Sequence, residues 1–178
     1  FPTETVYGIG ADARDAAAVR GIFAAKGRPV DNPLIVHILS VDLLETVAAD
    51  PPSIAFELFG RFAPGPLTLV VPVRESVPSE VTAGLATVAV RIPRHPVARA
   101  LLEACGRPVA APSANRSGEP SPTTVDMARR SLGDAVDVYL DGGACDVGLE
   151  STVAAVEVGT VTILRPGADR KSTRLNSS

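Results

Sequence analysis

The residues with the clearest capacity for chemistry lie in one polar loop, Pro112–Thr124, whose sequence is PSANRSGEPSPTT. Hydroxyl and amide groups come from Ser113, Asn115, Ser117 and Ser121, and a glycine lets the backbone approach a ligand closely. Three prolines stiffen the loop, and no large apolar side chain interrupts it. These groups suit phosphate or carboxylate oxygens, although a polar surface loop without a ligand remains the alternative.

Two cations, Lys26 and Arg28, flank Gly27 where a predicted helix ends. An arginine can bind oxygens with two N–H groups at once, whereas a lysine acts as a point charge. The pair could therefore surround one polyphosphate. The alternative is a solvated helix C-terminus, at which cations interact favourably with the helix dipole.

Arg91 stands within the apolar stretch TVAVRI, where a guanidinium needs an anion or carbonyl oxygens as partners. Ligand binding and a structural salt bridge both satisfy that need. Arg165 follows the apolar residues VTIL, and the same reasoning applies to it. His37 lies in the predicted strand LIVHI, where a single histidine is more often a core or edge residue than a ligand.

Further polar residues recur where predicted strands end and loops begin. They are Thr3, Thr5, Tyr7, Asn32, Thr87, Ser151 and Thr152. Because ligands of open sheets bind at strand ends, we expect these side chains to converge on one site.

The elements that must position these residues are read from hydrophobic periodicity and from capping residues. Asp15 is a candidate N-cap and Gly27 a stop signal for the first helix. Helices are expected over 16–26, 40–49, 52–62, 95–105 and 124–132, and a polar loop over 74–86. Strands are expected over 34–38, 67–73, 87–92, 108–111 and 136–140, followed by a hairpin, 151–158 with 161–164, that turns over Gly159–Thr160. This order favours an α+β (mixed α/β) fold with one mixed sheet and flanking helices.

Composition narrows the class of protein. With 178 residues and a mean hydropathy of +0.22, the chain fits one folded domain and is not intrinsically disordered. Its two cysteines and two histidines form no sequence-local cluster, so we expect no protein-ligated metal. No apolar stretch reaches the roughly 20 residues that a membrane-spanning helix needs. We therefore expect no membrane association.

The two ends differ from the rest of the sequence. The first residue is Phe1, and the chain opens as if within a strand, so we expect an upstream segment to be missing. The last nine residues, RKSTRLNSS, are polar and unpatterned, which indicates a disordered or foreign tail. Without Arg170, Lys171 and Arg174, 14 of the 17 basic residues face 20 acidic ones, a net charge of −6. That charge argues against general nucleic-acid binding.

Seven stretches of this sequence together resemble the YrdC-like family of threonylcarbamoyl-AMP synthases in its short, single-domain form. They are PTETVYGIGADA (2–13), KGRPVDNPLIVHI (26–38), APGPLTLVV (63–71), VAVRIPRHP (88–96), PVAAPSANRSGEPSPT (108–123), GLESTV (148–153) and ILRPGA (163–168). The match runs in order and without large gaps, which predicts one YrdC-like domain over 1–168 and a non-family tail over 169–178.

The resemblance implies a twisted mixed sheet around a concave cavity and a nucleotidyltransferase activity in the cytoplasm. Members of the family condense L-threonine, bicarbonate or CO2, and ATP into threonylcarbamoyl-AMP and pyrophosphate. A downstream threonylcarbamoyl-transferase complex then modifies tRNA. Mg²⁺ is expected with the ATP phosphates.

The resemblance also assigns roles to individual residues. Thr5, His37, Arg91 and Ser151 would bind threonine. ATP would be held by Lys26, Arg28, Asn32, Thr87, Ser113, Asn115, Ser121 and Arg165. The catalytic set implied by the family's KxR and SxN motifs is Lys26, Arg28, Ser113 and Asn115.

Two other functions stay open at the level of sequence. The carbamoyl-adenylating domain of hydrogenase maturation proteins shares this fold and uses carbamoyl phosphate. Alternatively, the domain could bind double-stranded RNA or tRNA weakly and catalyse nothing. The acidic net charge and the small number of aromatic residues argue against RNA binding as the main function.

Overall fold

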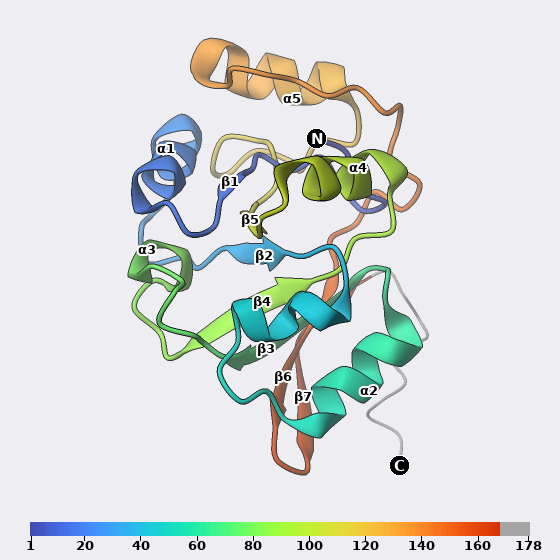
Figure 1. Cartoon of the computed structure of the whole chain (residues 1–178). Coiled ribbons are helices and arrows are strands. Elements are labelled where there is room, and N and C mark those ends of the chain that lie inside the picture. Colours follow the sequence, from blue (N-terminus) through green and yellow to red (C-terminus); the bar gives the residue numbers. More distant parts are fainter. Residues whose placement is uncertain (168–178) are drawn as a thin grey trace.

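The computed structural model describes residues 1–167 and has a seven-stranded mixed sheet at its centre (Figure 1). The strands are β1 (Ala11–Asp12), β2 (Ile35–His37), β3 (Leu67–Pro72), β4 (Thr87–Arg91), β5 (Val109–Ala110), β6 (Thr152–Glu157) and β7 (Thr160–Arg165). Their order across the sheet is β1-β5-β2-β4-β3-β6-β7. The pairs β2–β4 and β3–β6 are parallel, and the other pairs are antiparallel. The predicted fold class is confirmed.

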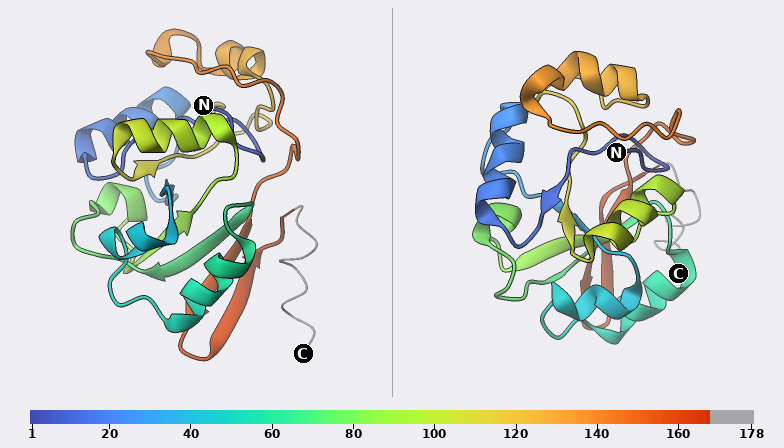
Figure 2. Two further views of the ribbon diagram at one scale, coloured as in Figure 1. Left: turned by 45° about the vertical axis from the view of Figure 1, so that its right-hand side comes forward. Right: turned by 45° about the horizontal axis from the view of Figure 1, so that its top comes forward.

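Helices flank this sheet at two ends of the molecule (Figures 1 and 2). They are α1 (Ala16–Lys26), α2 (Ser53–Phe62), α3 (Ser79–Thr82), α4 (Pro96–Cys105) and α5 (Val125–Leu132), with 3-10 helices η1 (Val41–Thr46) and η2 (Gly133–Ala135). Helices α1, α4 and α5 lie at one end, whereas α2 and the β6–β7 hairpin lie at the other. The core fills the space between the helices and the sheet.

Helix α1 shows how local chemistry places two predicted site residues. The Asp15 side chain accepts hydrogen bonds from the backbone N–H groups of Ala17 and Ala18, which caps the helix. Gly27 ends it in the left-handed conformation, with φ 59°. The chain therefore changes direction between Lys26, the last residue of α1, and Arg28, so the two side chains occupy different surroundings although they are two residues apart.

The polar loop 112–124 is joined to the first residues of the chain by backbone hydrogen bonds. Tyr7 N–H donates to Pro122 O (2.8 Å), and Ile9 N–H donates to Pro112 O (3.0 Å). In return, Ala114 N–H donates to Tyr7 O (2.8 Å). These bonds hold the loop close to residues 3–9, which explains how two distant polar segments meet.

Several predicted elements differ from the structure. Residues 136–140 form no strand, because Val136 and Tyr139 pack on the core with a spacing of three while Val138 is exposed. The helix expected over 40–49 is the shorter η1, and Ser40 makes no side-chain cap bond.

Other differences are smaller. The predicted loop 74–86 contains the single-turn helix α3. The two-residue strand β1 was not predicted, since it is recognisable only through its pairing with β5. The hairpin turns over Val158–Gly159, one residue earlier than expected, because Thr160 pairs with Glu157. The predicted tail 169–178 lies outside the described residues.

Candidate active site

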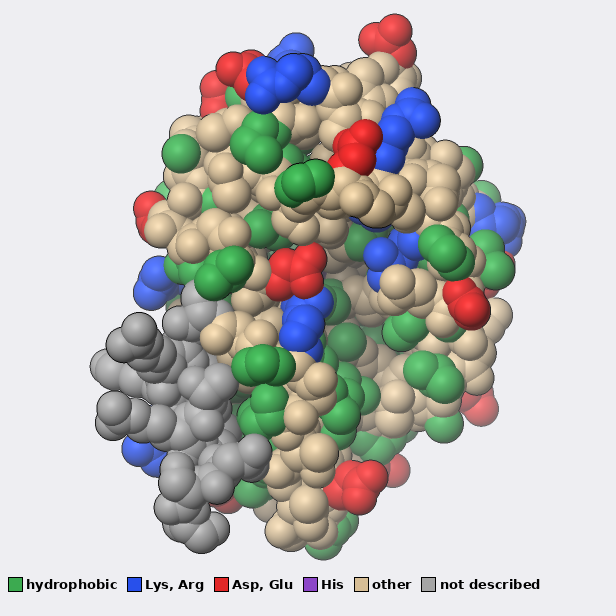
Figure 3. Space-filling model, turned by 180° about the vertical axis from the view of Figure 1, so that it is seen from behind, with side chains coloured by type: hydrophobic (Ala, Val, Ile, Leu, Met, Phe, Trp, Pro, Cys, Tyr) green, Lys and Arg blue, Asp and Glu red, His purple; other side chains and the backbone are tan. Residues whose placement is uncertain are grey.

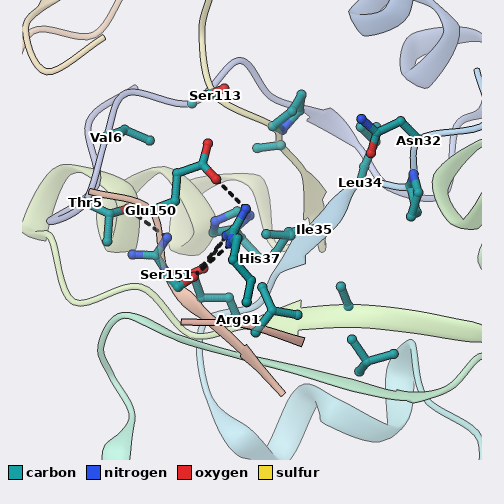
Figure 4. Close-up of a pocket in the computed structure, with 18 of the residues that line it drawn as sticks. Thr5, Val6, Asn32, Leu34, Ile35, His37, Arg91, Ser113, Glu150 and Ser151 are labelled. Atoms are coloured by element: carbon teal, nitrogen blue, oxygen red, sulfur yellow. Dashed lines mark hydrogen bonds and ion pairs between the residues drawn. The ribbon is translucent and has the colours of Figure 1, made fainter. Parts of the chain in front are cut away.

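A cavity of about 520 Å³ lies against the sheet, within the size range of small-molecule sites. Figure 3 shows basic side chains, in blue, around a hollow on the side of the molecule opposite to the view of Figure 1. Nine of the twelve predicted site residues line the cavity, namely Thr5, Arg28, Asn32, His37, Thr87, Arg91, Ser113, Ser151 and Arg165. Figure 4 shows Thr5, Glu150 and Ser151 on one side of it and Asn32 on the opposite side.

Strand alternation explains why β4 contributes three of the lining residues. Successive side chains of a strand point to opposite faces, so Thr87, Ala89 and Arg91 share the face that lines the cavity. Val88 and Val90 point the other way into the core. In the neighbouring strand β2, His37 is directly opposite Arg91 in the register, which brings these two predicted residues together.

Lys26 lies neither in the cavity wall, where it could contact a polyphosphate, nor at a solvated helix end, the two positions that the sequence suggested. Its side chain is buried, does not line the cavity, and donates hydrogen bonds to the backbone oxygens of Ser113 and Asn115. Burial lowers the pKa of its ammonium from 10.5 to about 8, and the nearby positive charge of Arg28 adds to the decrease. In this structure Lys26 therefore holds the 112–124 loop from behind, whereas Arg28 lines the cavity.

Asn115 and Ser121 also lie outside the cavity wall. The Asn115 amide donates to the backbone oxygens of Arg116 (2.9 Å) and Glu119 (2.8 Å), which stabilises the loop internally. Its Oδ1 atom is buried and has no hydrogen-bond partner within residues 1–167. Ser121 donates to the Glu150 carboxylate (3.2 Å). Their predicted contacts with a nucleotide remain predictions.

Arg165 is held at the cavity by the segment that precedes β6. Its guanidinium forms an ion pair with Glu150 and donates to the backbone oxygen of Ser151 at 3.0 and 3.2 Å. The Ser151 hydroxyl in turn shares a hydrogen bond of 2.8 Å with Thr68 Oγ1. Among the described residues, Glu150 is the only acidic side chain that lines the cavity.

For Arg91 the structure shows the salt bridge that was one of the two alternatives, whereas its contact with a ligand stays a prediction. Arg91 forms a buried ion pair with Glu4, with 2.7 Å between Nη2 and Oε1, and it also lines the cavity. Sequence reasoning missed Glu4 as its partner, because 87 residues separate the two. The only available signal was that a buried guanidinium needs a counter-charge.

His37 is buried in the cavity wall as a neutral ring. Burial, and secondly the positive charge of Arg91, lower its pKa from 6.5 to about 3. Its Nδ1 atom has no hydrogen-bond partner in the described part of the chain. At neutral pH the ring therefore adds no charge to a site that already contains three arginines.

The described residues do not offer a ready-made metal site. Residues 1–167 contain no group of three or more His, Cys, Asp or Glu side chains placed to hold an ion. Within the same residues, no helix is both long enough and apolar enough to cross a bilayer.

Comparison with known proteins gives one consistent result. Residues 1–167 match the family model Sua5_yciO_yrdC, described as telomere recombination. A Pyrococcus abyssi protein named threonylcarbamoyl-AMP synthase is 52% identical over 167 residues, which cover 94% of this chain and 49% of that protein. A Bacillus subtilis protein of the same name is 48% identical over 172 residues, covering 96% of this chain and 50% of the relative.

A solved structure agrees with these sequence matches. The crystal structure of P. abyssi Sua5 complexed with L-threonine superposes with a TM-score of 0.91 at 52% identity, over 94% of this chain and 49% of that one. This chain thus spans about half the length of these relatives.

Proposed function

Because the chain belongs to the Sua5/YciO/YrdC family over residues 1–167, we propose that it is an L-threonylcarbamoyladenylate synthase domain. Such a domain, a nucleotidyltransferase, joins L-threonine, bicarbonate or CO2, and ATP, and releases pyrophosphate. Its product would pass to a threonylcarbamoyl-transferase complex that acts on tRNA.

One observation carries this proposal: a single cavity brings together two sets of polar groups that suit two different substrates. Arg91, Thr5, His37 and Ser151 form one set, and Arg28, Asn32, Thr87, Ser113 and Arg165 form the other. The first set suits the carboxylate and ammonium groups of an amino acid. The second set, with two guanidinium groups and several hydroxyl and amide groups, suits the phosphates and ribose of ATP. The 52% identical relative crystallised with L-threonine supports an amino-acid substrate.

The reaction requires positioning more than covalent help from the protein. The threonine ammonium group loses one proton to solvent, its nitrogen bonds to the carbon of CO2 as one C–O π bond opens, and a second proton leaves the nitrogen for solvent, which gives a carbamate. A carbamate oxygen then bonds to the α-phosphorus of ATP, the bond from that phosphorus to the bridging oxygen breaks, and pyrophosphate leaves with the electron pair. Holding both partners in one cavity removes much of the entropic cost of their encounter.

The chain's own cations would stabilise the charge that develops in this step. Arg28 and Arg165, which both line the cavity, would donate to phosphate oxygens, and Lys26 would act through the loop that carries Ser113. Mg²⁺ would bind chiefly to the phosphates, because Glu150 is the only carboxylate lining the cavity among the described residues. When bound there, the ion would neutralise phosphate charge.

Pyrophosphate release from ATP tests the proposal directly. We expect release that needs both L-threonine and bicarbonate, and a decrease of about 10²–10³-fold in Arg28→Ala, the size seen when one charge-stabilising donor is removed. Ser113→Ala should also be slower, since it removes a hydroxyl from the cavity wall.

Two other outcomes would contradict the proposal. Release that depends on carbamoyl phosphate would assign the chain to the chemistry of hydrogenase maturation proteins. RNA binding that weakens steeply with salt, without any threonine-dependent turnover, would favour a binding module.

A further inference from the structure

The Glu4 carboxylate lies behind Arg91 and Thr5 of the cavity wall, and both of its oxygens accept hydrogen bonds. It is 1% exposed, and it does not line the cavity. Oε1 accepts a hydrogen bond from Arg91 Nη2 at 2.7 Å. Oε2 accepts from the backbone N–H groups of Arg94 (3.1 Å) and His95 (3.4 Å). One carboxylate oxygen is therefore fixed by the last residue of β4, and the other by the segment that follows it.

The Glu4–Arg91 pair is ionised, and burying it has a large free-energy cost because both charges lose their hydration. Burial by itself would raise the pKa of Glu4, but the attraction of Arg91 and the hydrogen bonds that the carboxylate accepts keep the pKa below its ordinary value of 4.5. Replacing a buried ion pair with apolar residues is often neutral or stabilising, so stability alone does not account for this pair. Its place at the cavity wall suggests another role.

The Arg91 guanidinium is held in one orientation by three acceptors on two segments of the chain, Glu4 and Thr5 on one and Gly65 on the other. Nη2 donates to Glu4, Nη1 donates to Thr5 Oγ1 at 2.9 Å, and Nε donates to Gly65 O at 3.3 Å. These bonds use three of its five N–H groups. One N–H on each terminal nitrogen keeps no partner within residues 1–167. A planar fork of this kind matches the geometry of a carboxylate.

The neighbouring threonine hydroxyls have a fixed direction as well. Thr3 Oγ1 donates its single hydrogen to Val6 O at 2.7 Å, so Thr5 must be the donor in the 2.9 Å bond between Thr5 Oγ1 and Thr3 Oγ1. The hydroxyl hydrogen of Thr5 is thus already engaged in a hydrogen bond, so Thr5 Oγ1 can only accept a hydrogen bond from a ligand. Arg91 can only donate. The two side chains together present a donor for a carboxylate and an acceptor for an amine or hydroxyl.

We propose that Glu4 is a positioning residue for the amino-acid substrate: it fixes Arg91 so that the remaining N–H groups meet the L-threonine carboxylate. The proposal rests on the proposed function, because it takes the Arg91 end of the cavity as the threonine site. Glu4 does not touch the substrate and acts only through Arg91. Its substitution should therefore affect threonine binding far more than ATP binding.

The test compares L-threonine and ATP titrations by calorimetry in Glu4→Gln. The glutamine side chain has nearly the same shape, but its amide nitrogen would face either Arg91 or the two backbone N–H groups, all of which are donors. We expect the dissociation constant for threonine to rise at least tenfold, while that for ATP stays within about twofold. In turnover, KM for threonine should rise in the same way, with KM for ATP unchanged.

A matched control is Asp12→Asn, which removes an ion pair of the same length, 2.7 Å to Arg107, that does not line this cavity. Its affinity for both ligands should equal that of the unsubstituted chain. If Glu4→Gln does not fold, Glu4→Asp keeps the charge but shortens the reach, and it should also weaken threonine binding selectively.

The outcomes separate this proposal from the one on which it rests. If the unsubstituted chain binds no threonine, the proposed function fails and this proposal fails with it. If the unsubstituted chain binds threonine and the folded Glu4 variants bind it equally well, only the positioning role is wrong. An equal loss of threonine and ATP binding would likewise overturn it, because that result indicates general damage.

Discussion

Lys26 and Arg28 show what residue types reveal and what they do not. Both were predicted from their charge and spacing to surround a polyphosphate, yet only Arg28 lines the cavity. The sequence identifies both as cations near a helix end, but it does not show which one turns inward. That depends on the left-handed Gly27 and on carbonyl oxygens 87 and 89 residues away.

Lys26→Met tests whether the buried ammonium organises the loop. Methionine keeps the apolar stem but leaves the backbone oxygens of Ser113 and Asn115 without their donor, so we expect the free energy of unfolding to fall by about 1–3 kcal/mol. ATP should bind about tenfold more weakly, because Ser113 is carried by that loop. Urea unfolding and calorimetry measure the two effects.

The control for this change lies on the same helix. Arg20 forms an ion pair with Glu80, but its side chain is 59% exposed, so Arg20→Met should alter stability by no more than about 1 kcal/mol. If Lys26→Met is less stable but still binds ATP as the unsubstituted chain does, the loop keeps its position without Lys26.

At the scale of elements, the sequence predicts best where periodicity and capping agree. Helix α1, with its Asp15 cap and Gly27 stop, and the β6–β7 hairpin lie close to where they were expected. The prediction of a strand over 136–140 was wrong, because apolar residues alone do not make a strand without a neighbouring strand to pair with. The short strand β1 depends entirely on such a neighbour, β5.

The turn after α2 offers a prediction about how an element supports the site. A Cβ at Gly65 would lie 2.6 Å from the backbone oxygen of Phe62, and the Gly65 carbonyl accepts from Arg91 Nε. Gly65→Ala must therefore shift this turn, and we expect a loss of about 1–3 kcal/mol in the free energy of unfolding. Threonine affinity should fall as well, since one of the three acceptors that orient Arg91 moves.

Gly60, in α2, is the natural comparison for that experiment. A Cβ there meets no atom within 4 Å, and the residue is exposed. Gly60→Ala should therefore stabilise the chain by about 0.5–1 kcal/mol, because alanine is the better helix former. A stabilised Gly65→Ala variant in the same urea series would show that the turn is not restricted as described.

At the scale of the whole molecule, the site forms only because segments that are distant in the sequence meet. Residues near 5, 28–37, 87–91, 113 and 150–165 each supply part of the cavity wall. The motifs predicted which residues matter, but periodicity and spacing could not predict contacts such as Glu4–Arg91. Arg91 ends β4 whereas Glu4 belongs to no strand, so their contact depends on how the N-terminal segment packs against the sheet.

The burial of His37 in the cavity wall predicts that the free energy of unfolding decreases in mild acid. His37 is neutral in the folded chain because burial lowers its pKa to about 3, whereas the unfolded chain takes up a proton near pH 6.5. The unfolded state therefore binds more protons between these values, so stability is complete above pH 6.5 and decreases as the pH falls toward 3. Glu4 acts in the same direction only below its ordinary value of 4.5.

His37→Leu isolates the histidine contribution, because it removes the titrating group and fills the buried space with an apolar side chain. Between pH 7.5 and pH 5, the unsubstituted chain should lose about 2 kcal/mol more of its free energy of unfolding than the variant does, at about 1.4 kcal/mol per pH unit below 6.5. Urea titrations at the two pH values measure this difference. Equal losses in both chains would mean that His37 becomes protonated in the folded state and that the cavity wall admits the charge.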